Sequence, residues 1–392
     1  MPTRIATALA EGTAREATVQ LCAEVRSQLG GQPPVLLAAF SSTQQPLDEV
    51  CAELARQFPD AIRIGASTAG GFTERGDEDG ATALFALAGD YRVFAGIGRG
   101  LKADPERAIT AAIDGLPSEV TGYPYCTAIL LLDPLAGNGE EATLITSSLL
   151  GPKVRLAGGS AGDDFHMVAT HVAAGGMVVS DAAVIALLFS RAPLGIGVCH
   201  GHVPVSGSYR VTRAEGNLVH EIEGRPAWPW WLDATKALAA AAGFGPPTSE
   251  EETAYLLRFH AGLAAGSEVK IRTALSRSGP TSISFACGIA EGTVFRLFES
   301  RPEPQIESAR EAARRALAQL DGRQAAGALV FDCACRKMIL HDDFKLAVRG
   351  MSAELGGAVL AGFATYGEIA LDVGDMSGFH NTTSVVLAFP EG

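Results

Sequence analysis

The sequence has few basic residues, and lysines and arginines nowhere form a run. Its 392 residues include 31 Lys and Arg against 44 Asp and Glu, which gives a formal net charge of −13. Proteins bind a phosphate backbone or an anionic membrane leaflet through clustered positive charge. The composition therefore argues against nucleic acid and membrane surfaces as partners.

Long apolar runs and a secretion signal are also missing. The longest apolar stretches, such as residues 182–189, fall far short of the roughly 20 residues that a membrane-spanning helix needs. Near the amino terminus, Glu11 interrupts the segment where the apolar stretch of a signal peptide would continue. We therefore expect neither a transmembrane anchor nor export, and the predicted location is the cytoplasm.

The cysteines do not indicate a disulfide framework. There are seven, an odd number, and most stand in apolar segments where a reduced cysteine packs as a small hydrophobe. Cys333 and Cys335 would share one face of an expected strand, but no further Cys or His lies beside them in that segment. We expect two packed thiols there and no metal site.

Glycine and apolar residues, in contrast, are abundant. Hydrophobic residues make up 47% of the chain and charged residues 19%, which predicts a folded protein with enough apolar surface for a core. The length exceeds that of one usual core, so two domains are expected. The 45 glycines cluster at strand ends, where a positive φ or a close approach to a ligand calls for glycine.

Three segments of the chain share one layout, namely strand, helix, strand, glycine turn and strand. Their turns lie at residues 65–71, 158–164 and 362–368. A strand–helix–strand unit has parallel strands, and the strand after the turn is expected to run antiparallel. We therefore predict an α/β fold with mixed sheets built from repeated strand–helix–strand–strand units, in two domains.

These motifs resemble those of the FIST family, a sensory module of bacterial signal transduction. The resemblance implies a FIST N-terminal domain over residues 1–225 and a FIST C-terminal domain over residues 226–392. It also implies binding of a small ligand such as an amino acid. Because no kinase or cyclase segment is fused, output is expected to pass through a separate partner such as a histidine kinase. The matching segments are residues 64–70 (IGASTAG), 158–164 (GGSAGDD), 211–217, 223–227, 331–336, 362–369 (GFATYGEI) and 380–382.

The turns combine backbone N–H groups with hydroxyls, which suits a small polar ligand beyond the carboxyl ends of the strands. Acidic side chains would bind its ammonium group and Arg336 its carboxylate. The alternative is that the glycines only form tight turns and the acids cap or pair with neighbours. The predicted ligand-binding residues are Ser67, Thr68, Gly70, Ser160, Gly162, Asp163, Asp164, Arg336, Tyr366, Glu368, His380 and Asn381.

A serine hydrolase is a competing interpretation. Residues 158–162 match G-x-S-x-G, the nucleophile elbow of α/β-hydrolases, with Ser160 as the nucleophile. That elbow leads directly into a helix, whereas the glycines and β-branched residues of the segment 170–180 indicate a β-hairpin. We therefore expect a protein without catalytic activity.

Haem is a further alternative, because some relatives in the FIST family look like haem-binding nitric oxide sensors that act on a histidine kinase. The candidate axial ligands are His380, beside Asn381, and His200. The sequence has no C-x-x-C-H attachment motif, and a lone histidine is more often a hydrogen-bonded structural residue. We expect no cofactor, with non-covalent haem left open.

Overall fold

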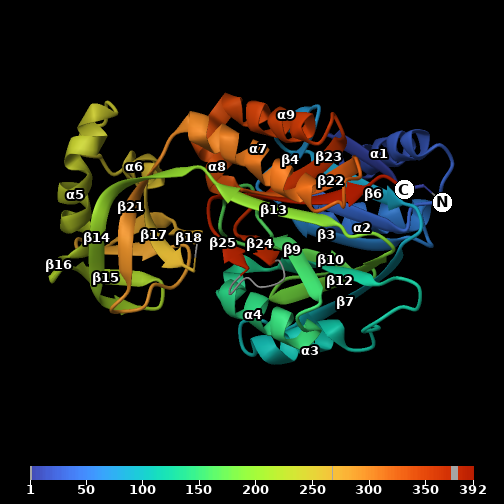
Figure 1. Cartoon of the computed structure of the whole chain (residues 1–392), viewed down its shortest axis with the longest axis horizontal. Coiled ribbons are helices and arrows are strands. Elements are labelled where there is room, and N and C mark those ends of the chain that lie inside the picture. Colours follow the sequence, from blue (N-terminus) through green and yellow to red (C-terminus); the bar gives the residue numbers. More distant parts are fainter. Residues whose placement is uncertain (1, 267, 372–377) are drawn as a thin grey trace.

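The computed structural model describes residues 2–266, 268–371 and 378–392 (Figure 1). Three units of similar construction make up the body of the molecule, and a lobe stands beside them. The first unit spans residues 4–88 and the second residues 92–190. The third combines residues 195–200 with residues 302–390, and the lobe, residues 202–300, is inserted after its first strand.

The first unit shows the plan that the other two repeat. Helix α1 is capped at its start by Thr13, whose side chain accepts the Glu16 N–H, and at its end by Gly30, which has a left-handed φ of 60°. Strands β2 and β3 are parallel, and β6 runs antiparallel between β1 and β2. The elements are β1 (Arg4–Ala10), α1 (Ala14–Leu29), β2 (Leu36–Ser41), α2 (Leu47–Gln57), β3 (Ile62–Ser67), β4 (Gly71–Thr73), β5 (Gly76–Glu78) and β6 (Thr82–Ala88).

The second unit has the same order. Its parallel pair is β8 and β9, and β12 lies antiparallel beside β8. The elements are β7 (Arg92–Arg99), α3 (Pro105–Ile113), β8 (Tyr125–Leu132), the short helix η1 (Pro134–Ala136), α4 (Gly139–Leu150), β9 (Val154–Ser160), β10 (Val172–Ala174), β11 (Met177–Val179) and β12 (Ala182–Ser190).

The third unit follows the plan around the inserted lobe, with β22 and β23 parallel and β26 antiparallel to β22. The predicted α/β fold with mixed sheets and repeated units is therefore confirmed. Cys335 lies in α8, so the strand expected to hold both Cys333 and Cys335 ends earlier than predicted. The elements are β13 (Gly195–His200), α7 (Pro302–Ala318), β22 (Ala325–Cys333), α8 (Ala334–Leu340), η2 (His341–Asp343), α9 (Phe344–Glu354), β23 (Val359–Thr365), β24 (Glu368–Leu371), β25 (Phe379–His380) and β26 (Thr383–Pro390).

The units exchange hairpins: in each unit, the hairpin that follows the glycine turn pairs with the sheet of another unit. Strand β4 of the first unit pairs with β23 of the third, β10 of the second with β3 of the first, and β24 of the third with β9 of the second. The exchange runs in a ring through all three units. Two of the three body sheets consequently combine strands from both sides of residue 225, the boundary suggested by the sequence.

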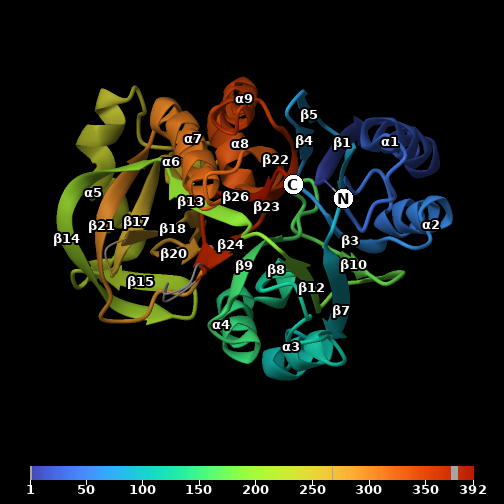
Figure 2. The same cartoon turned by 45° about the vertical axis from the view of Figure 1, so that its right-hand side comes forward.

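The three sheets surround one central core, and the helices lie outside them (Figure 2). Aromatic side chains from the first and third units meet in this core. The ring of Phe40 stacks on that of Phe363 with centroids 4.2 Å apart, and the edge of Phe331 packs on Phe40 at 6.5 Å. The outer faces pack on α1 and α2, on α3 and α4, and on α7 and α9. This packing brings the glycine turns of all three units together.

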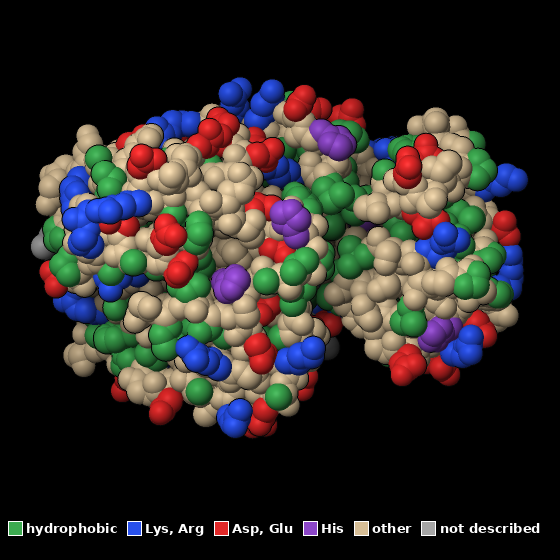
Figure 3. Space-filling view, turned by 180° about the vertical axis from the view of Figure 1, so that it is seen from behind, with side chains coloured by type: hydrophobic (Ala, Val, Ile, Leu, Met, Phe, Trp, Pro, Cys, Tyr) green, Lys and Arg blue, Asp and Glu red, His purple; other side chains and the backbone are tan. Residues whose placement is uncertain are grey.

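The lobe is one antiparallel sheet with two helices and its own apolar core, which includes the three tryptophans. Acidic and basic side chains intermingle over the face of lobe and body in Figure 3, and an indentation separates the two. No helix in the described part of the chain is long and apolar enough to cross a membrane. The elements are β14 (His202–Glu215), β15 (Leu218–Ile222), β16 (Arg225–Pro226), α5 (Ala227–Ala241), α6 (Glu252–Arg258), β17 (Phe259–Ala265), β18 (Glu268–Arg272), β19 (Ala274–Ser278), β20 (Ser282–Phe285) and β21 (Val294–Ser300).

Candidate functional site

The turns after β3, β9 and β23 bond to one another through the backbone, and we call the segments 67–71, 160–171 and 364–368 the turn hub. Glycine is required where the turns touch, since a Cβ on Gly162 would lie 2.6 Å from the backbone nitrogen of Ala69. Three equivalent bonds close a ring: the Ala364 N–H to the Gly70 carbonyl at 2.8 Å, the Ser160 N–H to the Gly367 carbonyl at 2.8 Å, and the Ser67 N–H to the His171 carbonyl at 2.9 Å.

The hydroxyl residues predicted to bind a ligand are buried in the hub. The hydroxyl of Thr68 accepts the Gly70 N–H at 3.0 Å, and that of Ser67 accepts the His171 N–H at 2.8 Å. Ser160 is fully buried, and its hydroxyl has no hydrogen-bond partner among the described residues. The structure thus brings the three residues together, while their role in ligand binding stays a prediction.

Asp163 holds the segment that follows Gly162. Burial acts to raise the pKa of Asp163, but the hydrogen bonds to its carboxylate outweigh burial and lower that pKa below its usual value. Burial and the bond to this carboxylate raise the pKa of Tyr366. The carboxylate accepts the N–H groups of Met167 at 2.8 Å, Val168 at 2.6 Å and Ala169 at 3.0 Å, and the Tyr366 hydroxyl at 2.7 Å.

Asp164 links the same segment to the first unit. Its carboxylate accepts the Ser42 hydroxyl at 2.9 Å and the Thr43 N–H at 2.8 Å, just beyond the end of β2. The carboxylates of both aspartates therefore accept hydrogen bonds from neighbouring groups. This is the arrangement expected under the alternative stated above, in which the acids cap or pair with neighbours and do not bind a ligand. Asp163 is buried beneath the surface of the hub, whereas Asp164 is partly exposed.

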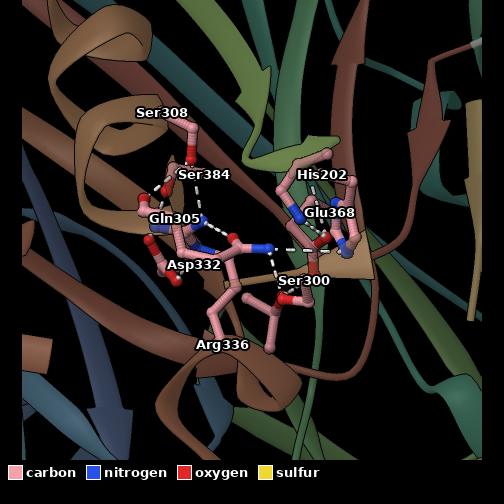
Figure 4. A network of polar contacts seen from close by, with 10 residues as sticks. His202, Ser300, Gln305, Ser308, Asp332, Arg336, Glu368 and Ser384 are labelled. Atoms are coloured by element: carbon pink, nitrogen blue, oxygen red, sulfur yellow. Dashed lines mark hydrogen bonds and ion pairs between the residues drawn. The ribbon is translucent and has the colours of Figure 1, made fainter. Parts of the chain in front are cut away.

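Glu368 and Arg336 lie in the interior of the third unit (Figure 4). Glu368 accepts the Thr365 hydroxyl at 2.7 Å and both the N–H and the hydroxyl of Thr383 at 3.0 Å, and burial raises its pKa well above the usual value. Arg336 is fully buried and belongs to a separate network. Its guanidinium donates to Asp332 at 2.9 Å, to the Ser308 hydroxyl at 2.9 Å, and to the side chain and carbonyl of Gln305.

His380 and Asn381 lie next to Glu368, because β25 pairs with β24. The His380 ring bonds through Nε2 to the Ala370 carbonyl at 3.2 Å, and burial lowers its pKa to about 4. Asn381 donates to the His380 carbonyl at 2.9 Å, and its side-chain oxygen has no partner among the described residues. These two residues extend the polar interior from the hub toward the lobe.

A hollow of about 520 Å³ opens beside the hub. Lys337 reaches the hub, since a Cβ on Gly70 would lie 2.7 Å from its Nζ, and Phe165 packs near Tyr366 with ring centroids 6.4 Å apart. The Lys337 ammonium pairs with Asp77 at 3.2 Å and Asp79 at 3.0 Å. We call it the hub hollow, and its lining residues are Glu11, Asp77, Glu78, Asp79, Phe165, Lys337, Met338, His341 and Asp342.

Sequence reasoning missed this lining, because none of the predicted ligand-binding residues belongs to it. Residues 77–79 belong to the hairpin that the first unit exchanges, and residues 337–342 follow β22 in α8 and η2. Charged residues in such segments carry no distinguishing pattern, so only the exchanged pairing of β4 with β23 brings them together. A larger hollow of about 740 Å³ lies at the opposite end of the second unit and contains no hub residue.

Comparison with known families finds two matches along the chain. A FIST N domain matches residues 35–225, and a FIST C domain matches residues 234–371. The chain belongs to the FIST family. FIST domains are a sensory family associated with signal transduction. The first two glycine turns lie in the FIST N match and the third in the FIST C match, so the hub is built from both.

One curated relative is an uncharacterised protein of the archaeon Methanocaldococcus jannaschii. The two chains are 31% identical over 80 residues, which is 20% of this FIST protein and 16% of the relative. The chain thus covers only a small part of that relative. The likeness carries no further information about a ligand.

The surroundings of Ser160 in this FIST protein differ from those of a hydrolase nucleophile. Strand β9 leads through the hub into the hairpin of β10 and β11, as the sequence predicted, rather than into a helix. No histidine among the described residues bonds to the Ser160 hydroxyl. At Ser160, the described residues thus show no serine–histidine hydrogen bond of the kind found in a hydrolase triad.

The candidate haem ligands do not fit that cofactor. His380 is held by the Ala370 carbonyl, and neither His380 nor His200 lines the hub hollow or the larger hollow of the second unit. Within the described residues, no group of three or more His, Cys, Asp and Glu side chains could hold a metal ion. We derive no haem chemistry from this site.

Proposed function

We propose that this FIST protein senses a small polar metabolite, with an amino acid as the first class to test, and binds it in the hub hollow without catalysis. One observation carries the proposal: a hollow with charges of both signs opens beside the joint of all three units. Binding sites combine a concave surface with a few well-placed polar groups. A separate signalling protein, such as a histidine kinase, would receive the output.

The charges of the hub hollow suit a ligand with both an ammonium and a carboxylate group. Acidic side chains outnumber Lys337 in the lining, so a cationic group is favoured there. Lys337 is the one lysine of the lining, and its ammonium would meet a carboxylate while Asp77 and Asp79 bind the ammonium of the ligand. In this proposal Asp163 and Tyr366 act indirectly, because they hold Phe165 at the rim.

A binding screen tests this function. Thermal shift followed by calorimetric titration with single amino acids should identify a ligand that raises the melting temperature of the wild-type protein. At a ligand concentration of 100 times Kd, linkage predicts about 2.7 kcal/mol of stabilisation. Lys337→Met should abolish the shift. The matched control is Lys153→Met, which alters a lysine of the larger hollow and should leave binding unchanged.

Two results would refute the proposed site. One is a stabilising amino acid whose affinity is equal in Lys337→Met and wild type. The other is the absence of any hit among amino acids and related small cations. Gly70→Val gives an independent check, because its side chain would displace Lys337 Nζ from a position 2.7 Å from the Cβ of residue 70.

The absence of catalysis is tested separately. We expect no turnover of generic esters, and Ser160→Ala should behave as the wild type because its hydroxyl is fully buried. An esterase rate that disappears in Ser160→Ala would replace the sensor proposal with a hydrolase. A Soret band after reconstitution with haem, lost in His380→Ala or His200→Ala, would likewise change the class of ligand.

A further inference from the structure

The second glycine turn contains a segment that the other two turns lack. In the first and third turns, Gly70 and Gly367 accept the ring-closing bond immediately before the exchanged hairpin. In the second turn His171 accepts that bond, so residues 163–170 have no counterpart in the other turns. Two of the three turns close the hub without such an insertion. The ring-closing bond of a turn therefore forms with or without such an insertion.

The inserted segment exposes large apolar side chains. The exposed fractions are 42% for Phe165, 55% for Met167 and 78% for Val168. Scattered exposed apolar residues are common on protein surfaces, but a cluster within one short segment indicates an interaction site. We call Phe165, Met167 and Val168 the apolar tip.

The backbone beneath the apolar tip is strained and firmly held. Asp164, Phe165 and Met167 have φ values of 51°, 67° and 55°, in the left-handed region that non-glycine residues rarely adopt. The carboxylate of Asp163, only 2% exposed, fixes this backbone through the three N–H bonds described above. A segment fixed in this way presents its side chains to a partner at a low entropic cost.

Acidic side chains lie beside one member of the apolar tip, Phe165. Phe165 lines the hub hollow together with Glu11, Glu78, Asp79 and Asp342, and the side chain of Asp79 is 93% exposed. The single lysine in this lining already pairs with Asp77 and Asp79. The surface therefore combines the apolar tip with an acidic rim on the side of Phe165, which complements a contact segment of the opposite charge.

We propose that residues 163–170 are the docking surface for the partner protein, and that the partner contacts them with a basic amphipathic helix. Apolar side chains of that helix pack on Phe165, Met167 and Val168, and its lysines or arginines face the acidic rim. The docking surface goes beyond the proposed function, because it assigns the output contact and does not depend on which metabolite is bound.

A defined peptide tests the docking surface on the full chain without any added metabolite. The probe is a fluorescein-labelled amphipathic helical peptide of leucine and lysine, measured by fluorescence anisotropy. The same peptide with glutamate in place of lysine is the reference. We expect the lysine peptide to bind more tightly, and the double variant Met167→Ser, Val168→Ser to weaken its binding about tenfold or more.

Matched variants separate this site from general attraction to an acidic protein. Leu144→Ser with Leu149→Ser removes another exposed apolar pair, on α4, 45% and 47% exposed, and should leave the affinity unchanged. Glu78→Gln with Asp79→Asn should weaken binding and reduce its dependence on salt. Because the tip side chains are exposed, the tip variant should keep the wild-type melting temperature.

Three outcomes overturn the docking proposal: equal binding of the lysine and glutamate peptides, wild-type affinity in the tip variant, or an equal loss in the α4 variant. Lys337→Met distinguishes this failure from failure of the metabolite site. That variant removes the proposed carboxylate anchor for the metabolite and leaves the apolar tip intact, so peptide binding should persist in it.

Discussion

The first and third units both have buried polar side chains near the end of the strand that precedes the second helix of the unit, but these side chains differ in charge. Ser41 at the end of β2 pairs with Thr82 of β6, and Asp332 near the end of β22 pairs with Ser384 of β26. Four residues further along each chain come Gln45 and Arg336. At the corresponding place in the second unit, Leu132 faces Ala183.

The two polar networks differ in charge and in the parts of the chain that they connect. The first is neutral: the Ser41 and Thr82 hydroxyls lie 2.8 Å apart, and Gln45 Nε2 donates to the Ala10 and Gly12 carbonyls at 3.1 Å. The third contains a buried ion pair, with Arg336 Nε 2.9 Å from Asp332. In the second unit the paired positions are apolar, and the neighbouring buried Asp133 instead accepts the Thr170 hydroxyl and the Asp181 N–H, both at 2.5 Å.

The charged network, which contains Asp332 and Arg336, lies where the lobe joins the body (Figure 4). Gln305 donates to the Ser300 hydroxyl at 2.8 Å and lies 3.4 Å from the His202 ring nitrogen, while its oxygen accepts from Arg336. His202 begins the first strand of the lobe and Ser300 ends the last. Through Gln305, the buried ion pair is therefore connected to both ends of the lobe. The first unit has no inserted lobe to hold.

Breaking the ion pair should give the largest effect. Arg336→Met leaves Asp332 buried without its cation, and we expect a loss of about 3–5 kcal/mol in the free energy of unfolding, measured by urea denaturation. The double variant Asp332→Ser, Arg336→Gln copies the first unit and should recover most of that loss. A double variant as unstable as Arg336→Met would show that the two networks are not interchangeable.

The repeat could be predicted from the sequence because its signals are local. Apolar runs and glycine turns at residues 65–71, 158–164 and 362–368 located the three strand–helix–strand units. The exchange of hairpins joins residues far apart in the chain, such as Phe72 with Gly362, and no local pattern specifies it. The hub hollow escaped prediction for the same reason.

The meeting of the three turns was predictable, but the lining of the candidate site was not. The turn residues do lie together, but the same glycines and acids that suggested a ligand also build the ring of bonds among the turns. Arg336 illustrates the limit: its motif places it at the end of a strand, and only the packing of α7 against α8 shows that Gln305 and Ser308 surround it.

Removing the neutral network should have a smaller effect than breaking the charged one. Gln45→Leu leaves the Ala10 and Gly12 carbonyls without their donor, which should lower the free energy of unfolding by about 1–3 kcal/mol. The neighbouring Gln44 is exposed, so Gln44→Leu should change stability by less than about 0.5 kcal/mol. If Gln45→Leu lowers the free energy of unfolding as much as Arg336→Met does, the charge of the network makes no difference to how much it stabilises each unit.

The histidines at the lobe attachment make the joint between the lobe and the third unit sensitive to pH. The rings of His202 and His260 pack with centroids 4.5 Å apart, and burial lowers the pKa of His260 to about 4 from 6.5. Because the unfolded chain takes up this proton more readily, the contribution to stability is complete above about pH 6.5 and is lost as the pH falls toward 4.

A histidine substitution isolates that contribution. His260→Gln retains a donor for the Leu257 carbonyl, which the ring contacts at 2.9 Å, but cannot be protonated. Between pH 7 and pH 5, wild type should lose on the order of 1 kcal/mol more stability than this variant in urea denaturation. Burial raises the pKa of Glu368 and Asp332, which acts in the opposite direction in both proteins and cancels in the difference. Identical pH profiles would assign the sensitivity to other groups and remove this contrast between the first and third units.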